Sequence, residues 1–251
     1  LHRFEQGVSS PERTLGEWAD FLTDSYQWGI IGATVRLGAI TTAWCVLIGF
    51  PTAMALHRLR RPLLRTVCYF ILFAPLLTSV VARTYGWSLV LGDAGFINSL
   101  LTEPGPLDEP VPLLYNLRGV VVAMVHILLP FMVFPVLSSL RQVGDDMAEA
   151  AADLGAPRWR RFLHVTLPLS IPGVIAGSQL CFALTISAFA TPSLLGGGRV
   201  HVLATNIYGD VGTLNWPRAA VAAYVLLALA LVALAVFASI QRRVLPTRRM
   251  R

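Results

Sequence analysis

One uncharged stretch near the middle of the chain decides the class of fold: residues 119–140 read GVVVAMVHILLPFMVFPVLSSL. These 22 residues contain no Arg, Lys, Asp or Glu and are almost entirely apolar. A helix of about 20 apolar residues crosses the hydrocarbon core of a bilayer. The stretch therefore predicts a transmembrane helix, in which Pro130 and Pro135 are tolerated because neighbouring helices satisfy the freed backbone groups.

Other long uncharged runs lie on both sides of this stretch, and they predict further spans. We expect spans at about 28–56, 65–91, 119–141, 168–190 and 218–240. The composition agrees, because 55% of the 251 residues are hydrophobic and only 14% are charged, against about 25% in soluble domains. The predicted fold class is all-α, a polytopic transmembrane helical bundle that forms a single domain over 1–251. A soluble enzyme, a disordered chain and a disulfide scaffold all fit poorly.

Arginine placement predicts the orientation of the bundle. All 20 basic residues are arginine, and 13 of them lie in the three segments that follow the first, third and fifth spans. Alternating topology puts these segments on one side, which the positive-inside rule makes cytoplasmic. Trp28 and Trp216 then fall at the outer interface. The arginines that give the net charge of +6 thus indicate the orientation in the membrane rather than nucleic-acid binding.

Residues 1–27 fall on the outer side in this topology, as a polar, acidic extracytoplasmic segment. They lack the basic start and apolar core of a signal peptide. We expect an earlier cytoplasm-to-outside helix, so that five visible spans become six in the native chain. The alternative is a five-span protein whose N-terminus lies outside.

The absence of lysine removes two kinds of chemistry. No P-loop lysine can bind nucleotide phosphates, and no Schiff base can form. If ATP powers this protein, another chain hydrolyses it. No metal-ligand spacing or nucleophile triad is present in the sequence. We therefore expect a chain that is no enzyme, with no catalytic residues and no metal site.

The segment between the third and fourth spans, 143–167, has an unusual pattern. An apolar stripe that includes Met147 and Leu154 predicts a short helix, which Gly155 ends. Pro157 begins a second, amphipathic helix that carries Trp159 among arginines. In a generic loop, such an apolar side would dock on the bilayer.

This segment resembles the EAA loop of ATP-binding-cassette (ABC) importer permeases. In that pattern Glu-Ala-Ala is followed by three residues and Gly, then by nine residues, Ile, one residue and Leu-Pro. Here Glu149 opens the pattern, Gly155 follows at the right spacing, Val165 replaces Ile, and Pro168 closes it. The resemblance implies the type I importer (MetI-like) fold and a coupling helix that docks into a groove on an ATPase. The residues assigned to ATPase coupling are Glu149, Ala150, Ala151, Asp153, Leu154, Gly155, Ala156, Pro157, Trp159, Leu167 and Pro168.

The resemblance also implies partners and a location. It implies a second permease subunit, identical or homologous, with the subfamily resemblance favouring a homologous heteromer. It also implies two ATPase subunits that hold ATP and Mg, and an extracytoplasmic substrate-binding protein. This chain itself would bind no cofactor and no nucleic acid, and would lie among the lipids of the bacterial cytoplasmic (inner) membrane as a multi-pass protein. The outer loops at 92–117 and 191–217, with the N-terminal segment, would dock the binding protein.

Three stretches resemble the polyamine and opine-type permeases in particular: 74–87 (APLLTSVVARTYGW), 91–98 (LGDAGFIN) and 190–199 (ATPSLLGGGR). The implied cargo is a polyamine or a related small charged compound. An opine, aminoethylphosphonate, ferric iron or thiamine are alternative cargoes. A secondary transporter is an alternative class, but it would usually carry intramembrane acids, and the predicted spans contain none.

Ionisable residues inside the spans mark a candidate substrate pathway. An intramembrane arginine either meets an anionic substrate or pairs structurally, because exposure to lipid is costly. A dicationic cargo would need carboxylates or aromatic faces, from the partner permease or from Asp93 and Asp210 at the outer mouth. The residues assigned to the pathway are Arg36, Arg83, Tyr85, Trp87, Ser187 and Thr191.

Overall fold

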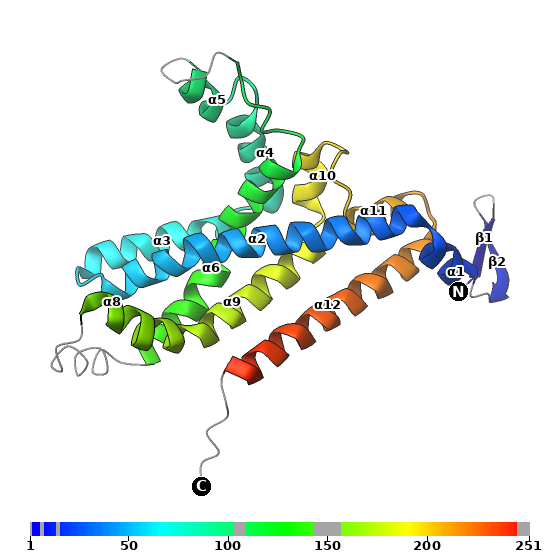
Figure 1. The fold of residues 1–251 in the computed structure, drawn as a ribbon. Coiled ribbons are helices and arrows are strands. Elements are labelled where there is room, and N and C mark those ends of the chain that lie inside the picture. Colours follow the sequence, from blue (N-terminus) through cyan, green and yellow to red (C-terminus); the bar gives the residue numbers. More distant parts are fainter. Residues whose placement is uncertain (1, 6–7, 14–15, 103–108, 143–156, 245–251) are drawn as a thin grey trace, which may run out of the picture. The chain divides into compact units, whose positions relative to one another are not determined.

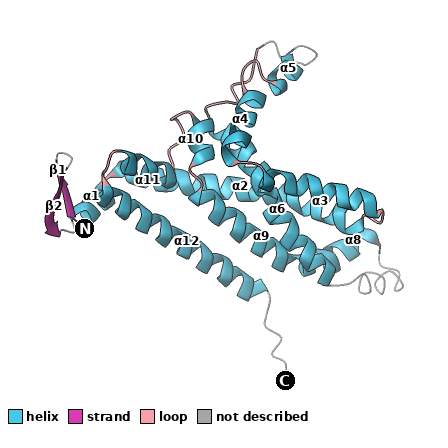
Figure 2. Cartoon of the chain, turned by 180° about the vertical axis from the view of Figure 1, so that it is seen from behind, coloured by secondary structure: helices cyan, strands magenta, loops and turns pink. Residues whose placement is uncertain are grey.

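The computed structural model describes residues 2–5, 8–13, 16–102, 109–142 and 157–244 (Figure 1). The all-α fold class is confirmed, with one addition in the N-terminal segment. There a short antiparallel hairpin joins β1 (His2–Glu5) to β2 (Val8–Arg13), with Phe4 opposite Ser9 (Figure 2). The sequence analysis predicted no element in this segment.

The helices follow in chain order. They are α1 (Gly16–Thr23), α2 (Ser25–Arg58), α3 (Pro62–Leu77), α4 (Val80–Leu91), α5 (Phe96–Thr102), α6 (Leu117–Gln142), α8 (Arg158–Arg161), the π-helical turn η1 (Phe162–Thr166), α9 (Leu167–Ser187), α10 (Ala190–Gly196), α11 (Leu203–Gly212) and α12 (Trp216–Val244).

Four helical runs in the described residues are long and apolar enough to cross a membrane. They are Ser25–Arg58, Leu117–Gln142, Trp159–Ser187 and Trp216–Arg243. A fifth candidate exists only as a broken pair, Pro62–Leu77 with Val80–Thr102. The hydropathy predicts one helix over 65–91, whereas the structure breaks it at Thr78 and Ser79. Ser79 has an extended backbone (φ −54°, ψ 137°), which ends the hydrogen-bond ladder of α3.

The helix that contains the fourth span is continuous with the short amphipathic helix expected before it. We expected the span to open at Pro168, but the helical run already starts at Trp159. The π-helical turn explains how it passes the proline. The Leu167 N–H donates to the Phe162 carbonyl, an i→i−5 bond. A wider turn suits this place, because Pro168 has no N–H and its ring would crowd the carbonyl four residues earlier.

The chain groups into two compact units, and each of the four unbroken spans contributes residues to both. Unit 1 comprises Leu1–Ile40, Thr78–Met124 and Ala183–Val232, and unit 2 comprises Thr41–Leu77, Val125–Phe182 and Ala233–Arg251. All six residues assigned to the substrate pathway fall in unit 1. The described part of the segment assigned to ATPase coupling, from Pro157 on, falls in unit 2.

Unit 1 is held together by an apolar core and by polar ties between distant segments. The buried side chains of Phe21, Ile30, Leu203 and Val221 form the core. At its edge, the Thr34 hydroxyl donates to the Ile30 carbonyl (2.8 Å) and accepts from the Leu203 N–H (2.9 Å). This bond satisfies one of the N–H groups that the start of α11 would otherwise leave unpaired.

One asparagine side chain links the segments between α4 and α6 in unit 1 by hydrogen bonds. The Asn98 side chain is fully buried. Its amide donates to the carbonyls of Gly92 (2.9 Å) and Val111 (3.0 Å), and its oxygen accepts from the Val111 N–H (2.9 Å). These three bonds hold two segments of the outer loop against α5, so the described part of that loop has a defined structure.

Glycines set the close packing of helices in unit 2. Gly173 and Gly177 are four residues apart on α9, a small-xxx-small arrangement that lets helix backbones approach. A Cβ atom at Gly173 would lie 2.7 Å from the Val136 Cα of α6, and one at Gly177 would lie 2.8 Å from the Met132 Sδ. A Cβ at Gly49 on α2 would meet the Met132 Cγ at 2.6 Å. The fully buried Met132 side chain therefore fills space left by glycines of two other helices.

Candidate functional site

The side chain of Arg83, in the first turn of α4, contacts the backbone at the break between α3 and α4. The end of a helix leaves carbonyl groups without intrahelical partners, and a guanidinium is a suitable donor to them. One terminal nitrogen of Arg83 donates to the Thr78 carbonyl at 2.7 Å. Its Nε is buried and has no hydrogen-bond partner among the described residues. The side chain is half-buried, and its hydrogen bond to Thr78 directs its charge at the backbone of the break.

A second break lies nearby in unit 1, where α9 ends at Ser187 and α10 begins at Ala190. The short helix α10 packs against α4, and both views show the two side by side (Figures 1 and 2). Thr191 on α10 is buried. Thr191 and Arg83 therefore lie on two helices, α10 and α4, that contact each other. Each of these helices begins at a break.

The remaining residues of the predicted pathway differ in their surroundings. Tyr85 on α4 is 61% exposed, whereas Trp87 is half-buried. The Ser187 hydroxyl donates back to the Ala183 carbonyl (3.0 Å), which occupies it locally. Arg36 is exposed on α2, a separate element of unit 1. The structure thus gives Arg83 a structural contact and leaves Tyr85 and Arg36 with exposed side chains.

We expect Arg83→Gln to lower the thermal stability of the permease, because it removes the charged donor from the break. A hydrogen bond to a charged group contributes about 1.5–3 kcal/mol. Melting of the purified protein measures this effect, and Arg36→Gln is the matched control, because Arg36 is exposed. If Arg83→Gln leaves the melting temperature unchanged and raises the KM of uptake, Arg83 contacts cargo instead.

Two side-chain pairs of unit 1 were not predicted from the sequence, whereas Asp210 was already named as a carboxylate at the outer mouth. The rings of Phe189 and Tyr208 stack with their centroids 5.0 Å apart, and both side chains are exposed. The Arg218 guanidinium lies 3.8 Å from an Asp24 carboxylate oxygen. Burial raises the pKa of the Asp210 carboxyl, and the positive charge of Arg218 partly offsets this. No periodicity signals such pairs, since their members are distant in the sequence.

The raised pKa of Asp210 predicts a pH dependence of stability. The folded protein binds this proton at higher pH than the unfolded chain, so the ionised carboxylate weakens the fold above that pKa. We expect Asp210→Asn to melt above wild type at neutral pH, with the difference shrinking as pH falls through the raised pKa. Melting curves from neutral to acidic pH, with Asp93→Asn at an exposed carboxylate as control, test this. A difference that grows on acidification would contradict it.

The described part of the predicted coupling segment begins at Pro157. The residues Glu149, Ala150, Ala151, Asp153, Leu154, Gly155 and Ala156 lie outside the described residues. Trp159 on α8 is 58% exposed, and the Arg160 guanidinium lies over its ring at 5.4 Å. Phe162 contacts Phe50 of α2 edge to face, with ring centroids 6.2 Å apart. Leu167 and Pro168 lie in the first turn of α9.

Several apolar helices of spanning length define a polytopic membrane protein. Residues 45–250 match the family described as binding-protein-dependent transport system inner membrane component, and the chain belongs to this family. It is a multi-pass inner-membrane protein and a permease component of a binding-protein-dependent ABC importer. The predicted family, the MetI-like fold and the location are therefore confirmed.

Curated relatives and a solved structure agree with this assignment. The chain is 33% identical over 189 residues to the spermidine/putrescine transport system permease protein PotB of Haemophilus influenzae, covering 75% of this chain and 66% of that protein. It is 34% identical over 188 residues to the molybdenum transport system permease protein ModB of Mycobacterium bovis, covering 75% and 69%. The fold matches a bacterial alginate ABC transporter, solved in complex with an alginate pentasaccharide-bound periplasmic protein, with a TM-score of 0.74. That match is 19% identical and covers 92% of this chain and 84% of the other.

Proposed function

We propose that this chain is a membrane subunit of an ATP-driven importer that moves a polyamine or a related small charged compound, delivered by an external binding protein. The observation that carries the proposal is the family match over 45–250, together with the identity to PotB. The coarse role, a transport permease, rests on the family. The identity of the cargo and the use of ATP are the parts of the proposal that go beyond that role.

The chemistry of unit 1 is compatible with a cationic cargo. The sequence raised one objection, since intramembrane arginines repel cations. For Arg83 the structure reduces this objection, because its guanidinium donates to the Thr78 carbonyl at the helix break. Exposed aromatic faces at Tyr85 and in the stacked Phe189–Tyr208 pair are suitable for alkylammonium groups. The Asp210 carboxylate supplies negative charge in the same unit.

An anionic cargo is the second candidate, and one observation favours it. Arg36 is exposed on α2 within unit 1, where it could present a positive charge to an anion. The ModB relative is 34% identical and the PotB relative 33%, so identity alone does not separate the two kinds of cargo.

The energy source is proposed to be two ATPase subunits that act on this chain and on a second permease. ATP and Mg would be held by those ATPases and not by this chain, which contains no lysine. The exposed Trp159 is a suitable aromatic anchor for a partner groove. The helical run that begins there continues into α9, so docking at this end would be transmitted to a membrane span.

Transport by the reconstituted complex tests the proposal. The complete transporter in proteoliposomes, with its binding protein outside and ATP inside, is supplied with labelled putrescine, spermidine or molybdate. We expect ATP-dependent uptake of a polyamine, and thermal stabilisation of the binding protein by the same compound. Uptake of molybdate alone would favour the second candidate. Uptake without ATP would contradict the ATP-driven scheme.

A further inference from the structure

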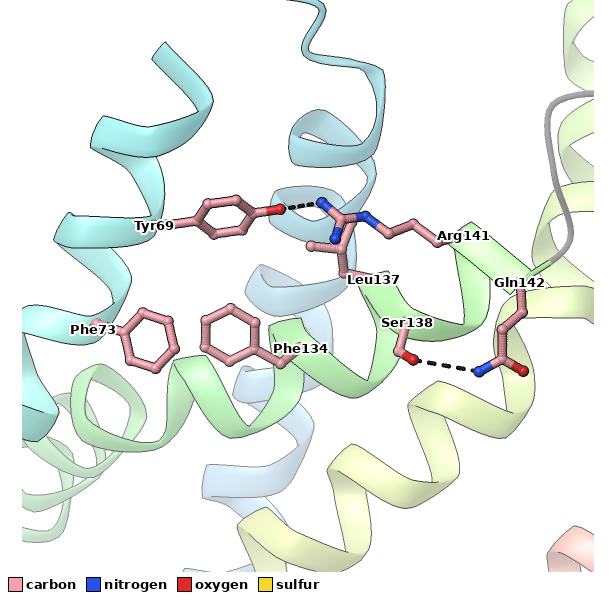
Figure 3. A pocket seen from close by; sticks show the side chains of 7 residues that line it. All are labelled: Tyr69, Phe73, Phe134, Leu137, Ser138, Arg141 and Gln142. Atoms are coloured by element: carbon pink, nitrogen blue, oxygen red, sulfur yellow. Dashed lines mark hydrogen bonds between the residues drawn. The ribbon is translucent and has the colours of Figure 1, made fainter. Parts of the chain in front are cut away.

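An open groove of about 520 Å³ lies between α3 and α6, entirely within unit 2 (Figure 3). At one end, the stacked rings of Phe73 and Phe134 make an apolar wall, with centroids 4.6 Å apart. At the other end, the Arg141 guanidinium donates to the Tyr69 hydroxyl and lies 5.9 Å from the centre of its ring. The groove is therefore apolar at one end and cationic at the other.

The polar end of the groove has further hydrogen-bonding groups. The Gln142 amide donates to the Ser138 hydroxyl at 3.4 Å, and both side chains are exposed (Figure 3). A guanidinium has five N–H donors, of which the Tyr69 hydroxyl takes one. Arg65 lies four residues before Tyr69 on α3, and therefore on the same face, and it is also exposed.

The charge of unit 2 is strongly one-sided. Its described residues contain ten arginines and no aspartate or glutamate. Arg141 and Arg65 therefore have no carboxylate partner within the described part of their own unit. Acidic residues in 143–156 lie outside the described residues. An anion from the surroundings would complement this end of the groove.

The spacing along α6 matches the layers of a membrane. Phe134 lies seven residues before Arg141, about 10 Å along the helix axis at 1.5 Å per residue. Arg141 is next to the last residue of the span, on the side that carries the arginine excess. In this orientation the guanidinium would lie at the depth of lipid phosphates, and the aromatic pair at the depth of acyl chains.

We propose that the groove between α3 and α6 binds one anionic phospholipid of the cytoplasmic leaflet. Its phosphate is held by Arg141 with Arg65, and its acyl chain lies along Phe73 and Phe134. Basic pockets between transmembrane helices on the cytoplasmic side are suited to anionic headgroups. A volume of about 520 Å³ is within the range of sites for small ligands. The bound lipid would stabilise the contact between α3 and α6 at their cytoplasmic ends.

Lipid-dependent stability of the delipidated transporter complex tests the site. We expect phosphatidylglycerol to raise the melting temperature more than phosphatidylcholine does. Arg141→Gln should remove this preference and weaken phosphatidylglycerol binding about fivefold, the contribution of one arginine near an anionic surface. Arg243→Gln is the matched control, because Arg243 is exposed at the end of α12, and it should keep the preference.

A second measurement locates the lipid without relying on stability. A photoactivatable phosphatidylglycerol should label peptides of α3 and α6 in wild type and in Arg243→Gln, but much less in Arg141→Gln. Equal labelling in all three proteins would overturn the proposal. So would equal stabilisation by inorganic phosphate, which indicates a free-anion site, or cross-linking of Phe73→Cys to a second permease, which indicates that a protein covers the groove.

Discussion

We expect the Gly173→Ala variant to lose thermal stability, because a Cβ atom at this position cannot be accommodated. It would meet the Pro135 carbonyl oxygen and lie 2.7 Å from the Val136 Cα. Both are backbone atoms of α6, so no side-chain rotation relieves the overlap. Overpacking of this kind costs about 1–3 kcal/mol, and here it separates two helices. Melting of the purified permease, and the yield of folded protein after mild extraction, measure the loss.

Gly32→Ala is the matched control for this prediction. Gly32 lies inside α2, where an added Cβ meets nothing within 4 Å. Alanine is favoured over glycine in a helix by about 1 kcal/mol, so this variant should be as stable as wild type or more so. If both variants melt together with wild type, the close approach of α9 and α6 is not a determinant of stability.

We expect Gly155→Asp to abolish coupled transport while the permease remains folded. Gly155 lies outside the described residues, so this prediction rests on the EAA-loop resemblance. If the segment docks into an ATPase groove, an aspartate would bring a side chain and an unpaired charge into a tight apolar contact. A loss of about 2 kcal/mol or more, the scale of an interface hot spot, would weaken docking about thirtyfold or more.

Co-purification of the ATPase subunits and substrate-stimulated ATP hydrolysis measure the effect of Gly155→Asp. The control is Gly212→Asp, the same substitution on α11, where an added Cβ meets nothing within 4 Å. We expect Gly212→Asp to retain the ATPase subunits on co-purification and both variants to melt close to wild type. Substrate-stimulated hydrolysis is compared with wild type alone, because Gly212 lies in a loop expected to dock the binding protein. If Gly155→Asp retains wild-type ATPase co-purification and substrate-stimulated hydrolysis, the segment does not couple the permease to the ATPase.

The class of fold could be predicted from the sequence because lipid imposes strong rules. A span must be apolar for about 20 residues, and the loops must carry arginine on one side. The interruption at Thr78 and Ser79 did not follow from these rules, because hydropathy measures composition and not backbone continuity. The amphipathic helix before the fourth span was predicted, but its continuity with that span was missed. Pro168 was interpreted as the start of a new helix, whereas a π-helical turn lets one helix continue through it.

The candidate site could be predicted only in part. Tyr85 and Thr191 come from motifs, and the structure places them on two helices that contact each other. From the sequence, Arg83 could have either a substrate-binding or a structural role. Its partner is the backbone carbonyl of Thr78 at a helix break, and hydropathy does not reveal that break. The pairs Phe189–Tyr208 and Arg218–Asp24 join distant segments of the chain, and one sequence alone gives no signal for such pairs. The Gly-xxx-Gly spacing at 173 and 177 was visible and would have predicted the packing of α9.

The glycine contacts around Met132 have a mechanical consequence. One flexible side chain of α6 fills space beside both α2 and α9, and Phe162 at the base of α9 contacts Phe50 of α2. A displacement of the basic helix before α9 therefore cannot remain in α9 alone, since three helices share these contacts. An unbranched thioether adapts to small sliding of its neighbours without leaving a void. These shared contacts favour a response of unit 2 by shear of three helices over bending of one.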